Sequence, residues 1–212
     1  MQICESEIEA LRQRVRAYMS EKRYKHTLGV EAMAEALAGY CLQEKCVLVR
    51  CAALLHDIAK EMSGEEQIAV LRDMPEITDS DIASSPAHHA FCAPYIVKRD
   101  FPELAQPDVL SAVFNHTTGS PEMSVFDEII FLADYIEPGR EYADCIRIRD
   151  SLLARLKSAK NREECLLWLH RAVIDELDST LVSLKKRGMY INERTVATRE
   201  AFAKKFPSAQ KL

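Results

Sequence analysis

Glycine is scarce in this chain. It contributes 6 of 212 residues, where average usage of about 7% would give roughly 15. Proline adds 8 residues. Glycine and proline make most of the tight turns that join short strands, and no segment shows a sustained alternation of apolar and polar residues. The shortage therefore disfavours a sandwich or barrel with many hairpins and favours long helices.

Disulfide and zinc-knuckle patterns are also absent. The seven cysteines are odd in number and contain no C-x-x-C pair: Cys4, Cys41, Cys46, Cys51, Cys92, Cys145 and Cys165. Residues 1–10 are acidic and lack the apolar run of a signal peptide. No apolar run reaches the length of about 18 residues that suggests a membrane helix. We expect reduced, mostly buried thiols in a cytoplasmic protein that has no membrane partner.

An excess of positive charge is the third feature that is missing. Lys and Arg number 28 against 33 Asp and Glu, which gives a net charge of −5. Nucleic-acid binding needs a basic surface, and the only short basic run is Lys185-Lys186-Arg187. We therefore expect no nucleic-acid partner, although a local basic pocket for a phosphorylated small molecule is compatible with this charge.

Apolar residues recur at helical spacing through most of the chain, which predicts an all-α fold. We expect a single domain over residues 1–212, with a core at about 5–205 and roughly nine or ten helices. The predicted helices are 5–20, 22–40, 44–60, 65–74, 87–101, 107–115, 124–136, 144–157, 162–186 and 195–206. Pro94 is expected in a first turn or at a kink, Ser124 as a cap and Gly188 at a helix end.

Two aspartates stand at the ends of apolar runs. Asp57 follows His56 and the run 51–55, and Asp134 follows the run 129–133. A buried carboxylate is costly unless it is paired or binds a cation. Together with the upstream His26 they form a set of imidazoles and carboxylates, which suits iron, manganese or zinc. The sequence therefore predicts a metal site, with Lys60 on the same helical face as Asp57.

Four segments around these residues carry a family resemblance: 23–30, 53–60, 116–119 and 130–140. The order His, His-Asp, Asp resembles the HD-domain metal-dependent phosphohydrolases. The segments closely resemble the YqeK family of bacterial proteins, and the likeness covers roughly residues 5–205. It implies an HD-type helical bundle and an enzyme that hydrolyses diadenosine tetraphosphate symmetrically into two ADP.

The resemblance also implies roles for particular residues. The metal ligands would be His26, His56, Asp57 and Asp134, with iron preferred and Mn, Co, Ni or Zn as alternatives. The catalytic residues would be Asp57, Lys60, His89 and His116. The substrate contacts would be Arg23, His89, His116, Thr117, Asp134, Arg140, Ile191, Arg194 and Thr195. His88 is the alternative to His89. The segment 190–195 departs from the family, which more often has His-Pro before its Arg-Thr, and it would close over nucleoside.

These roles define an expected mechanism. A bound cation lowers the pKa of water from about 15.7 toward roughly 7, and Asp57 would also orient that water. Arg23, Arg140 and Lys60 would offset phosphate charge. His89 and His116 would protonate the leaving phosphate, bind phosphate or hold a second metal, and the sequence leaves these three roles open.

Two other functions compete with this one. The first is another HD-domain phosphohydrolase, acting as a nucleotidase or on guanosine alarmones. The second is a non-catalytic module that binds a metal or a nucleotide. A purely structural metal site prefers a closed ligand set, so the extra His and Arg residues favour an enzyme. A homodimer is left open.

Overall fold

The computed structural model describes residues 5–210 and contains no strand among them. It confirms the all-α prediction. The helices are α1 (Glu5–Arg16), α2 (Glu21–Cys41), α3 (Cys46–Leu55), α4 (Gly64–Arg72), α5 (Asp79–Ala83), α6 (His88–Asp100), α7 (Pro107–Asn115), α8 (Val125–Ile136), α9 (Ala143–Ser158), α10 (Arg162–Lys186), α11 (Glu193–Lys205) and α12 (Pro207–Gln210), with the 3₁₀ helices η1 (Gln43–Lys45), η2 (Ser85–Ala87) and η3 (Pro102–Leu104).

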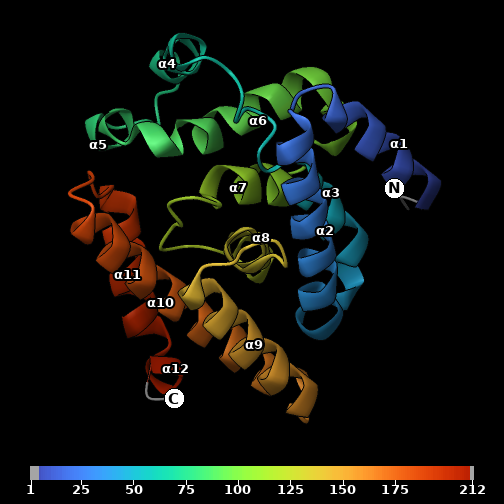
Figure 1. The fold of residues 1–212 in the computed structure, drawn as a ribbon, viewed down its shortest axis with the longest axis vertical. Helices are drawn as coiled ribbons and strands as arrows, with labels where there is room; N and C mark the ends of the chain where they lie inside the picture. Colours follow the sequence, from blue (N-terminus) through green and yellow to red (C-terminus); the bar gives the residue numbers. More distant parts are fainter. Residues whose placement is uncertain (1–4, 211–212) are drawn as a thin grey trace.

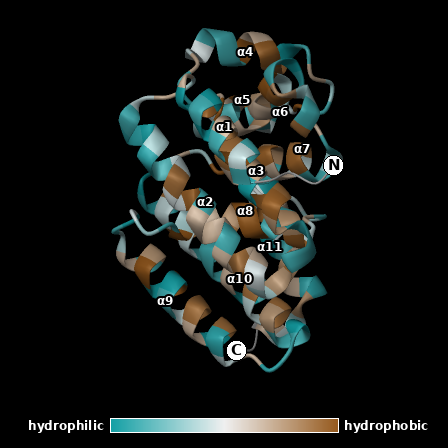
Figure 2. Ribbon diagram, turned by 90° about the vertical axis from the view of Figure 1, so that its right-hand side faces the viewer, coloured by the Kyte–Doolittle hydropathy of each residue, from teal (hydrophilic) through white to brown (hydrophobic). Residues whose placement is uncertain are grey.

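Helix α8 forms the centre of the bundle (Figure 1) and packs against α2, α3, α7 and α10. Its middle is a continuous apolar run, residues 129–133, as expected of a largely buried helix, and in Figure 2 it stands out in brown. Ile129, Ile130 and Leu132 are completely buried. Ser124 caps its first turn in a capping box with Asp127, as expected. The last turn of this buried helix carries Asp134 into the middle of the molecule.

The structure contains all ten predicted helices and adds two short ones, α5 and α12. These have five and four residues, so neither is long enough to show a helical period. Helix α5 forms because Thr78 and Asp81 make a reciprocal capping box. Pro94 lies inside α6, and Gly188 adopts a positive φ of 62° just after the end of α10, as expected of a helix-ending glycine.

The predicted helix over 44–60 is wrong at its end. Helix α3 stops at Leu55, and residues 56–60 form turns in which Ile58 N–H donates to Leu55 and Lys60 N–H donates to Asp57. The His56 ring contributes to this end because its Nδ1 lies 2.7 Å from the carbonyl oxygen of Ala53. His56 and Asp57 therefore project from a turn, and Lys60 does not share a helical face with Asp57.

The cysteines of the described region are all free, and Cys46 alone among them is only partly buried. Burial raises the pKa of the Cys41, Cys51 and Cys92 thiols to about 12, so they stay protonated. Cys4 lies outside the described residues. Within residues 5–210, no helix combines the length and the hydropathy needed to cross a membrane.

Candidate active site and metal centre

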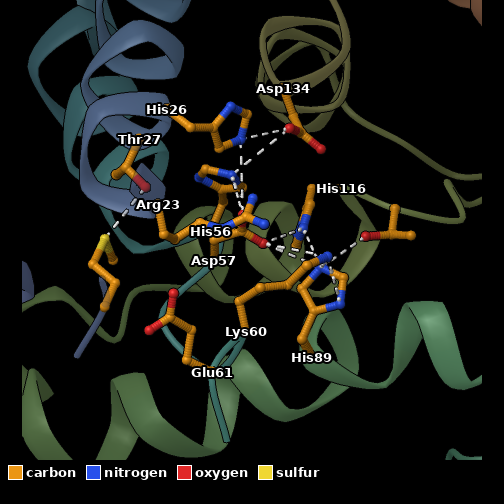
Figure 3. Close-up of polar contacts among 12 residues, drawn as sticks. Arg23, His26, Thr27, His56, Asp57, Lys60, Glu61, His89, His116 and Asp134 are labelled. Atoms are coloured by element: carbon orange, nitrogen blue, oxygen red, sulfur yellow. Dashed lines mark hydrogen bonds and ion pairs between the residues drawn. The ribbon is translucent and has the colours of Figure 1, made fainter. Parts of the chain in front are cut away.

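Histidines and aspartates from five distant parts of the chain meet at one place (Figure 3). They project from α2, the turn after α3, α6, the end of α7 and α8. The six residues are His26, His56, Asp57, His89, His116 and Asp134. Four of them are buried, and His26 and Asp134 are partly exposed. The site therefore has a closed floor and an opening beside α2 and α8.

The four predicted metal ligands lie close together and belong to two overlapping groups that could each hold a metal ion, one of His26, His56 and Asp134 and one of His56, Asp57 and His116. His26 Nε2 is 3.0 Å from Asp134 Oδ1 and 3.8 Å from Asp57 Oδ2. His56 Nε2 is 3.4 Å from Asp57 Oδ2 and 3.9 Å from Asp134 Oδ1. Two imidazole nitrogens and two carboxylate oxygens thus face a common centre, which is a donor set for a divalent transition metal.

Hydrogen bonds behind the imidazoles fix their orientation. Nδ1 of His56 donates to the carbonyl of Ala53 at 2.7 Å, and Nδ1 of His116 donates to the carbonyl of Val113 at 2.8 Å. A carbonyl only accepts, so Nδ1 carries the proton in both rings and the lone pair is on Nε2. This arrangement presents a ligand atom to a metal and is typical of metal-binding histidines.

Three buried atoms at the centre have no hydrogen-bond partner among the described residues: His26 Nε2, His56 Nε2 and Asp57 Oδ1. Buried polar groups are almost always satisfied, because leaving one unpaired is costly. A cation bound between these atoms would satisfy the two imidazole nitrogens. The residues present therefore fit a divalent metal.

Both carboxylates at the centre are ionised. Burial raises the pKa of Asp57, but His56, His116 and His89 outweigh burial and hold that pKa well below its usual range. For Asp134, burial likewise raises the pKa but is outweighed, chiefly by His26, whose Nε2 lies 3.0 Å from Asp134 Oδ1. Two negative charges in a buried site need positive partners, which again favours a bound cation.

A second group of polar side chains lies on the other side of Asp57. His89 Nε2 is 3.2 Å and His116 Nε2 is 3.7 Å from Asp57 Oδ1. Thr117 Oγ1 is 3.3 Å from His89 Nε2. Burial lowers the pKa of His89 to about 4, so its ring is neutral at pH 7. His88 points elsewhere, with its Nε2 2.9 Å from the carbonyl of Ile82, so His89 is the histidine that the structure places at the site.

Three cationic side chains surround the carboxylates. Arg23 pairs with Asp57 Oδ2 at 2.7 Å, and Arg140 pairs with Asp134 Oδ1 at 2.7 Å. Lys60 Nζ lies 3.9 Å from Asp57 Oδ1 and 3.0 Å from His89 Nε2. Guanidinium groups bind phosphate oxygens in pairs, so the site combines a metal-ligand set with groups suited to a phosphate chain.

The HD domain family model matches residues 23–139, the segment that contains every histidine and aspartate of this site. The chain belongs to the HD-domain family. The match begins at Arg23, ends just before Arg140 and spans more than half of the chain. Divalent metal binding is therefore a property of this HD-domain protein, carried by the histidine and aspartate cluster described above.

Curated relatives show to which family within the HD-domain hydrolases the chain belongs. The chain is 34% identical to a protein of Halalkalibacterium halodurans named symmetrical bis(5′-nucleosyl)-tetraphosphatase, over 88% of the chain and 91% of that protein. A Bacillus subtilis protein with the same name is 31% identical over 87% and 91%. Within the HD-domain hydrolases the chain thus belongs to the YqeK-type symmetrical tetraphosphatase family, which confirms the resemblance seen in the sequence.

A solved structure agrees with this assignment. The chain is similar to a Clostridium acetobutylicum protein described as a predicted HD superfamily hydrolase involved in NAD metabolism. The TM-score is 0.78 at 31% identity, and the match covers 93% of this chain and 97% of that one. The fold of this HD-domain protein is therefore that of an HD hydrolase along nearly its whole length.

Helix α11, which begins within the predicted nucleoside segment 190–195, packs against the loop that follows His116. Gly119 in that loop has a φ of 70°, and a Cβ there would come within 2.8 Å of Thr198 Cγ2 on α11. Thr195 is buried and Ile191 is partly buried. Their substrate contacts stay a prediction, although the close packing of α11 places the segment on the Thr117 side of the metal centre.

Arg194 is engaged in an ion pair that sequence reasoning did not anticipate. Its guanidinium donates to both oxygens of Asp81 at 2.9 Å and to the carbonyl of Glu76 at 2.7 Å. Asp81 is completely buried, and Asn192 also donates to it. Arg194 therefore anchors α11 to α5, and its predicted contact with substrate would require this pairing to be shared or broken.

Arg194→Ala is expected to destabilise this HD-domain protein by about 2 kcal/mol at pH 7, because it leaves the buried Asp81 charge unpaired. For a chain of this size the melting temperature falls by about 4–8 °C. Burial raises the pKa of Asp81, but Arg194 and the Thr78 backbone outweigh burial and hold the pKa below its ordinary value. The stabilisation is thus present above the unfolded-state pKa of about 3.9 and is lost as pH falls through the lower folded-state pKa.

Thermal unfolding between pH 7 and pH 3 checks this prediction, since the gap between wild type and variant should close in acid. The matched control is Arg199→Ala, whose partner Asp178 is 51% exposed, so its effect should be small. An unchanged melting temperature with a raised KM would instead make Arg194 a substrate ligand.

Glu137 is a site residue that sequence reasoning missed. Its Oε1 lies 3.2 Å from His26 Nδ1, and Gly139 N–H donates to its Oε2 at 2.5 Å. Gly29 permits this approach, because a Cβ there would collide with Glu137 Oε2. The carboxylate holds the His26 ring with Nε2 toward Asp134, where the ring would serve as a metal ligand. The sequence feature that could have indicated this role is Glu-Pro-Gly directly after an apolar helix.

Glu137→Ala is expected to weaken metal binding by about 10–100-fold, because His26 loses the partner that fixes its orientation. Competition with a chromophoric chelator measures the metal dissociation constant. Glu137→Gln keeps an amide oxygen for the Nδ1 proton and should retain most of the affinity. Equal affinity in the wild type and the alanine variant would contradict a positioning role.

Proposed function

We propose that this protein hydrolyses diadenosine tetraphosphate symmetrically and releases two ADP. One observation carries the proposal: an ionised pair of carboxylates and a set of oriented imidazoles lie among three cationic side chains. This arrangement suits a metal-assisted attack on a phosphate chain. Relatives that share nine tenths of their length with the chain are named for this reaction.

The proposed resident metal is iron, held by His26, His56, Asp57 and Asp134. Mixed nitrogen and oxygen donors accept iron, and also Mn, Co, Ni or Zn. When bound, a divalent cation acidifies water and stabilises charge on phosphate oxygens. Metal analysis of protein purified without oxygen tests the identity of the ion.

The protein's own groups position the phosphate chain. Arg23 and Arg140 each bond one of the two carboxylates. Each guanidinium group can keep that contact and donate another N–H to a phosphate oxygen. Asp57 Oδ1 is buried and accepts no hydrogen bond, so it can accept a hydrogen bond from the attacking water and orient it. Lys60 supplies a positive charge beside it.

The two further histidines are proposed not to supply a proton: His116 can bind a metal through its Nε2, and neutral His89 can bind a metal or give its one N–H to a phosphate oxygen. His116 Nδ1 is bound to the Val113 carbonyl, and its remaining nitrogen is an acceptor. His89 is neutral because burial lowers its pKa to about 4. Lys60 and Thr117 lie beside His89 and can donate to the leaving phosphate.

A substrate panel separates this function from the competing ones. We expect kcat/KM for diadenosine tetraphosphate to exceed that for deoxynucleoside triphosphates, nucleoside monophosphates and guanosine alarmones by about 100-fold or more. A higher kcat/KM for any of these would move the protein to another HD phosphohydrolase activity. Tight nucleotide binding without turnover of any substrate would support the binding module.

Two properties lie beyond the site. The sequence leaves a homodimer open, and light scattering in solution measures the oligomeric state. The sequence predicts a cytoplasmic location, and cell fractionation tests it.

A further inference from the structure

The two oxygens of Asp57 divide the site into two sides. Arg23 pairs with Oδ2 at 2.7 Å. His89 and His116 lie at Oδ1, at 3.2 and 3.7 Å. Figure 3 shows the same division, with Arg23 on one side of the cluster and His116 on the other. A phosphate chain that crosses the metal centre therefore continues in two directions.

A symmetrical substrate needs a place for each of its two nucleotide halves. The family resemblance implies one nucleoside position, at the segment 190–195, whose helix α11 packs against the loop that follows His116. Cleavage in the middle of a tetraphosphate leaves an equal half on the opposite side of the reacting phosphorus. A second nucleotide position should then open on the Arg23 side.

A cavity of about 920 Å³ opens there, between the first turns of α2 and the loop 137–142. Arg23, His26 and Arg140 line both this cavity and the metal centre, so the two are continuous. Its volume lies in the upper part of the range for small-molecule sites, about 300–1,000 Å³. We call this cavity the α2 groove.

Two unpaired cations project from α2 beside the groove. Lys22 and Lys25 are exposed and line it, and neither forms an ion pair with any residue between 5 and 210. Of the two acidic lining residues, Glu137 already binds His26 and Gly139, which leaves Glu141. The free charge along α2 is therefore positive and suited to phosphate.

The most exposed large apolar side chain of the described region is at the far wall of the groove. Tyr142 has 73% of its surface exposed and stands at the N-cap of α9, where its carbonyl accepts from Ile146 N–H at 3.0 Å. The helix end thus fixes the backbone from which the ring projects. A solvent-exposed aromatic ring beside a cationic groove can stack on a nucleobase.

We propose that the α2 groove binds the second nucleotide half of the substrate, with Lys22 and Lys25 on its phosphates and Tyr142 stacked on its base. This inference rests on the proposed function and extends it by naming the residues that select a dinucleotide over a mononucleotide. None of these three residues belongs to the metal centre.

Tyr142→Ala, tested on two substrates, shows whether Tyr142 contacts the second nucleotide half. For diadenosine tetraphosphate, KM should rise about tenfold through loss of base stacking, with kcat changed little. Adenosine tetraphosphate carries a single nucleoside, which can lie on the Thr117 side. Its KM should therefore change less than about twofold. Tyr142→Phe keeps the ring and should keep the wild-type KM for both substrates.

Matched controls lie outside the groove. Tyr95 on α6 is 47% exposed, and Tyr95→Ala should leave both KM values unchanged. Lys22→Ala/Lys25→Ala should raise KM for the dinucleotide more in low salt than in high salt, whereas Lys157→Ala should not. An equal change for both substrates, or no change with diadenosine tetraphosphate, overturns the groove assignment alone. A wild-type protein that releases no ADP from diadenosine tetraphosphate overturns the proposed function and the groove with it.

Discussion

Asp57→Ala is expected to lower kcat for diadenosine tetraphosphate by about three orders of magnitude or more, the scale of losing metal-assisted catalysis. Both oxygens of this carboxylate face the centre. Oδ2 lies 3.4 Å from His56 Nε2 and pairs with Arg23, and Oδ1 lies 3.2 Å from His89 Nε2. Its removal takes away a proposed metal ligand and the group that orients water.

Two further variants make this result interpretable. Asp57→Asn keeps the shape of the side chain and should fold, yet it loses the charge and should lose nearly all turnover. Asp178→Ala removes a carboxylate that is 51% exposed and should keep wild-type kcat. Circular dichroism checks that each variant is folded. An Asp57→Ala enzyme with more than about a tenth of wild-type kcat would show that the metal assignment is wrong.

Removal of divalent metal is expected to abolish turnover and to lower the melting temperature. Metal-free protein holds two ionised carboxylates close together and leaves two buried imidazole nitrogens without hydrogen-bond partners, His26 Nε2 and His56 Nε2. A ligand that binds only the folded state at about 100 times its dissociation constant adds about 2.7 kcal/mol. Added metal should therefore raise the melting temperature by about 5–10 °C and restore activity.

The matched control for the metal effect is His56→Ala. It removes a ligand whose ring is completely buried, so added metal should shift its melting temperature much less. Thermal unfolding with and without ferrous or manganous ion measures both proteins. Full activity in protein shown by elemental analysis to be metal-free, or an equal shift in the variant, would contradict the proposed centre.

Much of the fold could be predicted because its helices are long enough to show a period. Helix α8 is the clearest case, since its apolar run and the Ser124 cap both mark its bounds. The end of α3 was predicted too late, because Ile58 and Ala59 extend the apolar pattern beyond the run that stops at Leu55. The helix ends where the His56 ring bonds the carbonyl of Ala53, three residues earlier, and a pattern of apolar residues does not encode this side-chain contact.

Part of the site could also be predicted from the sequence. Asp57 and Asp134 each follow a buried run, so burial of a charge could be inferred from neighbouring residues. Glu137 was missed because its role depends on His26, which is 111 positions away. The pairing of Arg194 with Asp81 spans 113 positions and depends on how α11 packs against α5, which local pattern does not encode.

The central claim is that this metal centre cleaves a dinucleoside tetraphosphate in the middle. The most direct test uses protein purified without oxygen, supplied with ferrous or manganous ion and diadenosine tetraphosphate, and anion-exchange chromatography of the products. We expect ADP as the only product from the first turnovers onward. Equal amounts of ATP and AMP would contradict symmetrical cleavage.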